Sequence, residues 1–273
     1  GLFHLDDGSR LLMVIHHLVI DGISWRILFE DIETLLQQWR TNEKLILPLK
    51  TGSFRDWTAL LYGDYSKCKR FIDAMQYWNG VINRQLLPIS RDNEEGLNRM
   101  QDRSTAHFSL NRETTAKLLT RAHNAYHTQV NDIILTALLC ALHRGFGMHQ
   151  VKIDMEGHGR ESIKDEVNVS RTIGWFTSIY PVILEHQAGT PGMLLKQVKD
   201  NLRGVPNNGM DYLIGKYITG VENAVEQNDA RILFNYLGQF DADTQNRSYT
   251  IAHESAGNTV AAASQCAYDW EIV

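Results

Sequence analysis

LLMVIHHLVIDGISWRILFE, residues 11–30, is the stretch that decides the fold. Residues 11–15 form an unbroken apolar run, which predicts a short strand that is buried on both faces. From Trp25 onwards, apolar residues recur every three or four positions, which predicts an amphipathic helix. An Asp-Gly pair that starts at Asp21 indicates a turn, and Ser24 is the expected helix cap. The stretch therefore predicts a strand, a polar turn and a helix.

Two adjacent histidines, His16 and His17, follow the apolar run directly. On an extended backbone their side chains point to opposite faces, so only one of them can enter a given cavity. This argues against a shared metal ion, because metal ligands normally come from one face, and we predict no metal-binding residues. The alternative interpretation is a polar strand end with hydrogen-bonded core histidines. The complete pattern HHxxxDG, which ends at Gly22, favours a functional role.

The decamer HHLVIDGISW resembles the core motif of the condensation-domain superfamily of nonribosomal peptide synthetases. Three further stretches are similar to signatures of its epimerization branch: MEGHGRE at 155–161, RTIGWFTSIYPV at 171–182 and FNYLGQFD at 234–241. Amide-forming condensation domains usually carry a different sequence after the residues that correspond to Gly174 and Phe176. Because the four motifs also occur in the family's order, the chain is identified as a member of this superfamily, with its epimerization branch as the most similar group.

Composition and charge exclude several classes of function. The chain has 273 residues, of which 43 % are hydrophobic and 22 % charged, values typical of a globular protein with a sizeable core. A net charge of −5, without a long basic run, predicts neither nucleic acid nor a membrane as partner. The three cysteines, Cys68, Cys140 and Cys266, form neither a zinc spacing nor a disulfide framework. They indicate a reducing, cytoplasmic location.

The order of predicted elements gives the fold class. Strand and helix patterns alternate along the chain, which predicts an α/β protein with mixed β-sheets. The resemblance implies the two-lobed fold of chloramphenicol acetyltransferase-like proteins, with residues 1–100 ending the N-terminal lobe and 104–273 forming an incomplete C-terminal lobe. Because family members have further residues before the histidine motif and further strands at the other end, we expect the sequence to be truncated at both ends.

Several local patterns predict individual elements. Ser53 with Asp56 resembles a capping box, and Thr190 followed by proline predicts another helix start. Residues 104–110 and 151–155 predict strands, the second of which delivers Glu156 at its end. We also expect the indole rings of Trp25 and Trp175 to lie in the core.

The resemblance also assigns the chemistry to particular residues. Removing a proton from the carbon beside a thioester carbonyl requires a positioned base, and inversion requires an acid on the opposite face. Glu156 and His17 match the family positions with these roles, and we predict that each can serve as acid or base. Tyr236 and Asn235 match positions that line the same channel, and we predict that they bind the substrate or its thioester oxygen. A polar cap at a strand end is the alternative for this second pair.

Four more residues are predicted to support the site. An aspartate in a tight turn beside a catalytic histidine often holds a loop through an ion pair, and Arg160 is the expected partner of Asp21. We assign His16 to structure, facing away from the cavity, and Gly22 to the turn.

The resemblance implies epimerization, from L to D, of the α-carbon of an aminoacyl or peptidyl thioester. The substrate would be tethered to the 4'-phosphopantetheine of a carrier domain, with no cofactor bound directly by this chain. The implied partners are the peptidyl carrier domain and adjacent synthetase domains. Two alternatives stay open: an amide-forming condensation domain and a non-catalytic carrier-docking module. The stretches EGHGRE and GWFTSIYPV speak against the first, and the intact pair of His17 and Glu156 speaks against the second.

Overall fold

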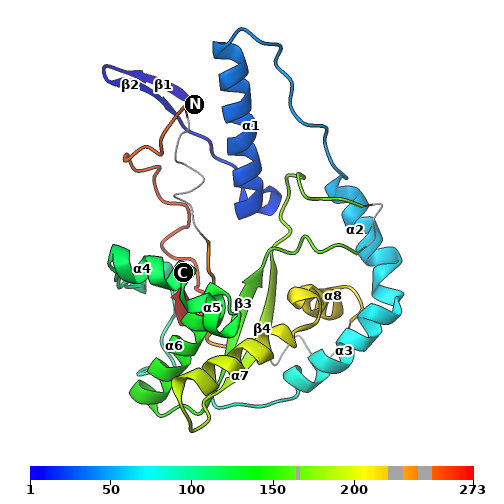
Figure 1. Cartoon of the computed structure of the whole chain (residues 1–273), viewed down its shortest axis with the longest axis vertical. Helices are drawn as coiled ribbons and strands as arrows, with labels where there is room; N and C mark the ends of the chain where they lie inside the picture. The colour runs from blue at the N-terminus through cyan, green and yellow to red at the C-terminus, as the bar shows by residue number, and fades with distance from the viewer. Residues whose placement is uncertain (164–166, 221–229, 239–247) are drawn as a thin grey trace. The chain divides into compact units, whose positions relative to one another are not determined.

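The computed structural model describes residues 1–163, 167–220, 230–238 and 248–273 (Figure 1). The chain divides into two compact units. Unit 1 comprises Gly1–Tyr65, His158–Thr177 and Leu237–Thr259. Unit 2 comprises Ser66–Gly157, Ser178–Tyr236 and Val260–Val273. The predicted lobes, 1–100 and 104–273, stay a prediction.

Unit 1 contains a β-hairpin and two long helices. The hairpin consists of β1 (Leu2–Leu5) and β2 (Gly8–Leu11), which pair antiparallel. A 3-10 turn, η1 (His17–Val19), leads to α1 (Gly22–Arg40), and α2 (Phe54–Gly63) follows.

The buried strand predicted for residues 11–15 is wrong. β2 ends at Leu11, and the side chains that follow are largely exposed, with Val14 84 % exposed. A strand needs neighbours that accept its backbone hydrogen bonds and cover its side chains. In the described part of the chain, β2 pairs with β1 alone, so the apolar run has no second neighbour.

The predicted cap of α1 is also wrong, because Asp21 and not Ser24 is the N-cap. Asp21 has extended backbone angles, and its side chain accepts a hydrogen bond from the Ser24 amide at 2.7 Å. A carboxylate at this position satisfies a free amide and interacts favourably with the helix dipole. The helix therefore begins before the first apolar residue of the repeat, and Ser24 lies inside its first turn.

The capping box predicted for α2 is confirmed. The Ser53 hydroxyl accepts a hydrogen bond from the Asp56 amide at 3.0 Å, and the Asp56 carboxylate accepts one from the Ser53 amide at 3.3 Å. These two bonds satisfy backbone groups that the helix itself leaves unpaired.

Ser53→Ala should lower the free energy of unfolding by about 1 kcal/mol, because alanine cannot accept the hydrogen bond of the first helical turn. Chemical denaturation followed by circular dichroism measures this change. Thr58→Ala is the matched control, since it removes a hydroxyl from the interior of α2 that bonds only to the helix backbone. Equal losses in the two variants would contradict a specific capping effect.

Unit 2 is built on a four-stranded sheet with the order β4-β3-β5-β6. Its strands are β3 (Gln150–Gly157), β4 (Ser178–Glu185), β5 (Ile232–Phe234) and β6 (Trp270–Ile272). β3 and β4 lie side by side (Figure 1) and pair antiparallel. β5 and β6 run parallel to β3 and to each other. The α/β class, the mixed sheet and the strand predicted at 151–155 are thereby confirmed.

The helices of unit 2 supply the other side of its core. They are α3 (Lys69–Ile82), α4 (Arg112–Thr120), α5 (Ala122–Tyr126), α6 (Val130–Phe146), α7 (Pro191–Arg203) and α8 (Met210–Tyr217). Trp78 of α3, Leu135 and Leu139 of α6 and Ile153 of β3 are fully buried in one hydrophobic cluster. The predicted start of α7 is confirmed, with Thr190 as its N-cap. Among the described residues, no helix has the length and apolar character needed to span a bilayer.

The strand predicted for residues 104–110 is wrong. These residues form no strand, and the Phe108 side chain is 92 % exposed. The alternating pattern satisfies the local requirement of a strand, but no described strand lies beside it to supply hydrogen-bond partners.

Candidate active-site residues

The end of β3 positions the predicted catalytic glutamate in unit 2. Glu156 is the penultimate residue of β3, and Asn235 directly follows β5, whose last residue, Phe234, pairs with Met155 of β3. The Asn235 side-chain amide donates a hydrogen bond of 2.5 Å to Glu156 Oε2. The Asn235 backbone amide donates to the carbonyl of Ile272 in β6 at 2.9 Å. Asn235 is therefore fixed by the sheet and orients a half-buried carboxylate at the strand end.

A row of ionisable side chains leads along β3 to Glu156. Lys152, Asp154 and Glu156 alternate along the strand and so share one face. Asp154 is buried and accepts a hydrogen bond from the Tyr268 hydroxyl at 2.8 Å. Burial raises the pKa of Tyr268, and the negative charges of Asp154 and Glu156 raise it further. The phenol therefore stays protonated and keeps donating its hydrogen bond to Asp154.

The backbone is closely surrounded where β3 ends. A Cβ atom on Gly157 would lie 2.8 Å from the Ser178 hydroxyl and 3.0 Å from the Asn208 carbonyl oxygen, so a side chain there would displace the hydroxyl and press on the Asn208 backbone. The backbone therefore passes close to β4 and to the turn before α8 immediately after Glu156.

Tyr236 follows Asn235 but has a different environment. It is half-buried and packs against the hydrophobic cluster of unit 2. Its predicted role as a donor to the thioester oxygen stays a prediction. The last three residues of the FNYLGQFD motif, 239–241, lie outside the described residues.

The predicted ion pair between Asp21 and Arg160 is confirmed in unit 1. Arg160 Nη2 lies 2.9 Å and 3.1 Å from the two Asp21 oxygens, and the side chains are 5 % and 2 % exposed. Asp21 also accepts hydrogen bonds from the amides of Ser24 and Phe176, at 2.7 Å and 3.1 Å. The carboxylate therefore caps α1 and holds the segment around Phe176 at the same time.

Arg160 connects several segments of unit 1. Its Nη1 donates to the carbonyls of Val169 and Thr172 at 2.8 Å and 2.7 Å, and its guanidinium lies 4.0 Å from the centre of the Phe176 ring. Burial lowers the pKa of Arg160, and the Asp21 carboxylate counteracts this shift. A buried charge of this kind is tolerated only when several groups compensate it, as Asp21 and the two carbonyls do here for the terminal nitrogens of the guanidinium.

Ser24 and Phe176 are site residues that sequence reasoning missed. The Ser24 hydroxyl is fully buried, donates to the Gly174 carbonyl at 2.9 Å and accepts from Arg160 at 2.9 Å. Gly174 and Phe176 belong to the motif RTIGWFTSIYPV, which the sequence analysis identified. Nothing in the sequence, however, indicated that this motif contacts the start of α1. Because Ser24 was predicted to cap the helix, its hydrogen bonds to Gly174 and Arg160 were not expected.

The two histidines of the motif differ in their local roles. His16 caps η1, because its Nδ1 accepts a hydrogen bond from the Leu18 amide at 3.1 Å, which agrees with a structural role. The His17 side chain is exposed, and its ring lies edge-on to Trp175 with the ring centres 5.3 Å apart. Trp175 is 41 % exposed, so its predicted core position is wrong. Nothing in the structure explains glycine at position 22, where a Cβ would meet no atom within 4 Å.

Trp25, also expected in the core, is half-buried. It stacks on Phe29, with the ring centres 5.8 Å apart. It therefore lies at the margin of unit 1 and not in its interior.

Curated relatives match this chain over most of its length. Bacitracin synthase 3 of Bacillus licheniformis is 39 % identical over 258 residues, which cover 94 % of this chain and 4 % of that protein. Gramicidin S synthase 1 of Brevibacillus brevis is 40 % identical over 265 residues, covering 95 % of this chain and 24 % of that protein. The chain thus spans a small part of the curated relatives it matches.

Solved structures show the same fold. The epimerization domain from the third module of tyrocidine synthetase B superposes with a TM-score of 0.85 at 36 % identity, over 98 % of this chain and 60 % of that one. The X-domain from teicoplanin biosynthesis, at 17 % identity and a TM-score of 0.62, shares the fold over 85 % of this chain and 53 % of that one. The predicted two-lobed fold class is thereby confirmed. The condensation domain family model matches residues 1–273, and the chain belongs to the condensation domain family.

Proposed function

We propose that this chain is an epimerization domain, which interconverts the L and D configurations at the α-carbon of an aminoacyl or peptidyl thioester. The observation that carries the proposal is the carboxylate of Glu156, held at the end of β3 by Asn235. The proposal is also supported by the similarity of nearly the whole chain to an epimerization domain. In the proposal, the thioester is formed with the phosphopantetheine arm of a carrier domain, which is the expected partner within a peptide synthetase.

The proposed reaction moves protons and changes no oxidation state. The base takes the hydrogen of the α-carbon as a proton, and the electron pair of that bond delocalises onto the thioester oxygen as an enolate. An acid on the other face returns a proton to the same carbon, which inverts its configuration. The enzyme is restored when the base releases its proton and the acid regains one, in exchange with water.

Glu156 and His17 have complementary chemistry for these two roles. In the proposal they act on opposite faces of the substrate carbon, and each serves as base in one direction and as acid in the other. The edge of Trp175 against the His17 ring restricts the orientations of the imidazole. The ion pair of Asp21 and Arg160 supports the turn that follows His17 but does not take part in proton transfer.

Deuterium incorporation tests the proposed reaction. A carrier domain loaded with an L-aminoacyl group is incubated in heavy water with the synthetase polypeptide that carries this chain, and the released amino acid undergoes mass and chiral analysis. We expect deuterium at the α-carbon and a mixture of L and D forms. Amide formation with a second loaded carrier, without deuterium at the α-carbon, would indicate a condensation reaction instead. Binding of the carrier without either reaction would favour a docking module.

A further inference from the structure

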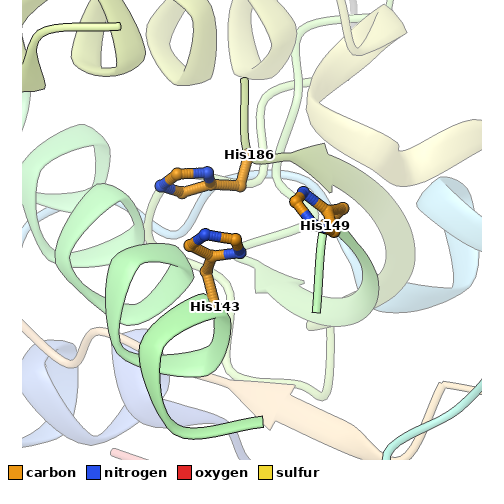
Figure 2. Close-up of side chains that lie close together, drawn as sticks. All are labelled: His143, His149 and His186. Atoms are coloured by element: carbon orange, nitrogen blue, oxygen red, sulfur yellow. The ribbon is translucent and has the colours of Figure 1, made fainter. Parts of the chain in front are cut away.

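Three histidines gather at the opposite end of β3 in unit 2. His143 lies in the last turn of α6, His149 immediately precedes β3, and His186 immediately follows β4. Their side chains each offer a nitrogen, and these three nitrogens lie within 4.8 Å of one another. Figure 2 shows the rings of His143 and His186 stacked on each other with His149 beside them.

The backbone brings these histidines together through regular structure. β3 and β4 pair antiparallel from Gln150 opposite Glu185, so the residues flanking that pair are neighbours. The His186 amide donates to the His149 carbonyl at 2.7 Å. α6 ends at Phe146, and its C-cap Gly147 has a φ of +67°, so the chain turns there towards β3. The cluster therefore connects a helix end with two strand ends.

One hydrogen bond fixes the ring nitrogen that His143 can offer. Its Nδ1 lies 3.2 Å from the carbonyl oxygen of Met148. A carbonyl oxygen only accepts hydrogen bonds, so Nδ1 carries the hydrogen and Nε2 has the free lone pair. Metal-binding histidines commonly have this arrangement, in which a backbone carbonyl fixes the tautomer and the ring orientation.

We propose that His143, His149 and His186 form a binding site for a divalent transition-metal ion, with zinc as the favoured ion. Three imidazole ligands and a water molecule complete the tetrahedral coordination that zinc prefers, and imidazole is a preferred ligand of zinc. The ion would join the end of α6 to the adjoining ends of β3 and β4. This proposal departs from the expectation, drawn from the sequence, that the chain has no metal-binding residues.

Binding requires a local rearrangement of the rings. The planes of His143 and His186 are 12° from parallel, with centres 3.9 Å apart, so they do not converge on one point. In tetrahedral coordination, zinc–nitrogen bonds of about 2.0 Å require ligand nitrogens separated by roughly 3.3 Å. His149 is exposed and His186 half-buried, so these side chains can rotate towards a common ion. Arg144 follows His143 in the chain, and its positive charge repels a metal ion. This repulsion and the rearrangement of the rings both lower the affinity for zinc.

The site is separate from the proposed reaction. Glu156 follows His149 by seven positions, along the length of β3, which corresponds to about 24 Å of extended strand. Zinc at the cluster would therefore contribute to the stability of unit 2 and not to proton transfer at Glu156.

Zinc titration of the purified, metal-free chain without a histidine tag tests the site. Isothermal titration calorimetry should show one zinc ion bound per chain, and the melting temperature should rise when zinc is added. His149→Ala should weaken zinc binding at least tenfold and abolish the rise, because it removes one of three ligands. This position is chosen because the His149 side chain is exposed, so its replacement leaves folding intact. His186→Ala should have the same effect.

His107→Ala is the matched control, since His107 is an exposed histidine of unit 2 outside the cluster. It should bind zinc as the unaltered chain does. Unchanged zinc binding in His149→Ala and His186→Ala would overturn the proposal, because the ion would then lie elsewhere. Absence of binding to the unaltered chain at about 100 µM zinc would overturn it as well.

Discussion

Glu156→Gln should lower the rate of deuterium incorporation at the substrate α-carbon by roughly 10²- to 10⁴-fold, the usual contribution of a positioned general base. Glutamine has nearly the same shape as glutamate, and its amide oxygen can accept the hydrogen bond from Asn235, so the strand end should keep its structure. It cannot take up a proton near neutral pH, however. Exchange in heavy water, measured by mass spectrometry on a loaded carrier domain, gives the rate.

Glu185→Gln is the matched control for this experiment. Glu185 ends β4, the neighbouring strand, and forms an ion pair with Arg84 that is partly exposed. Replacing it removes the same charge from the same sheet, with an expected cost of less than about 1 kcal/mol of stability. Deuterium incorporation should persist in this variant. A Glu156→Gln variant that exchanges as fast as Glu185→Gln would exclude Glu156 as the base.

The role of Asn235 can be separated from that of Glu156. Asn235→Ala keeps the carboxylate but removes the hydrogen bond that orients it. Misplacing a reacting group by about 1 Å costs up to roughly 100-fold in rate, so this loss should be smaller than that of Glu156→Gln. A loss as large as that of Glu156→Gln would assign Asn235 a direct part in the reaction.

Elements that depend on local chemistry could be predicted from the sequence. The capping box of Ser53 and Asp56 and the start of α7 at Thr190 need only residues that are close together in the chain. The pairing of Asp21 with Arg160 was also predictable, because a charged residue in a turn beside a motif needs a partner of opposite charge. The resemblance to a known family supplied the fold class, which local patterns alone left as α/β.

Apart from the pair of Asp21 and Arg160, which lie 139 positions apart, features that depend on distant partners could not be predicted. The apolar run at 11–15 and the alternating run at 104–110 satisfy the local pattern of a strand, but a strand forms only beside another strand. Ser24 illustrates the same limit, because its buried partners Gly174 and Arg160 lie more than 130 residues away. The three clustered histidines are likewise separated in sequence and match no metal-binding spacing.

Asp21→Ala should lower the free energy of unfolding by about 3–5 kcal/mol, because it leaves the buried charge of Arg160 without its counter-ion. The same substitution removes the N-cap of α1 and the acceptor for the Phe176 amide. Since domains are stable by only about 5–15 kcal/mol, much of the variant should be unfolded or insoluble. Urea denaturation followed by tryptophan fluorescence measures the loss.

Glu30→Gln is the matched control for this prediction. Glu30 pairs with Arg171 in unit 1, but its side chain is 55 % exposed, and Arg171 also contacts Asp31. Removing this carboxylate should cost less than about 1 kcal/mol, because water already screens the pair. If Asp21→Ala and Glu30→Gln lowered the free energy of unfolding by similar amounts, burial of the Asp21–Arg160 pair would contribute little to stability.

Combining Asp21→Ala with Arg160→Met separates the ion pair from the other contacts of Asp21. Methionine removes the buried charge, so the double variant should be more stable than the sum of the single losses by about 0.5–3 kcal/mol. The double variant should still be less stable than the unaltered chain, because Arg160 also donates hydrogen bonds to the carbonyls of Val169 and Thr172. Strictly additive losses would place the effect of Asp21 in its bonds to backbone amides. An Asp21→Ala variant that folds with full stability yet fails to exchange the α-hydrogen would instead place Asp21 among the catalytic residues.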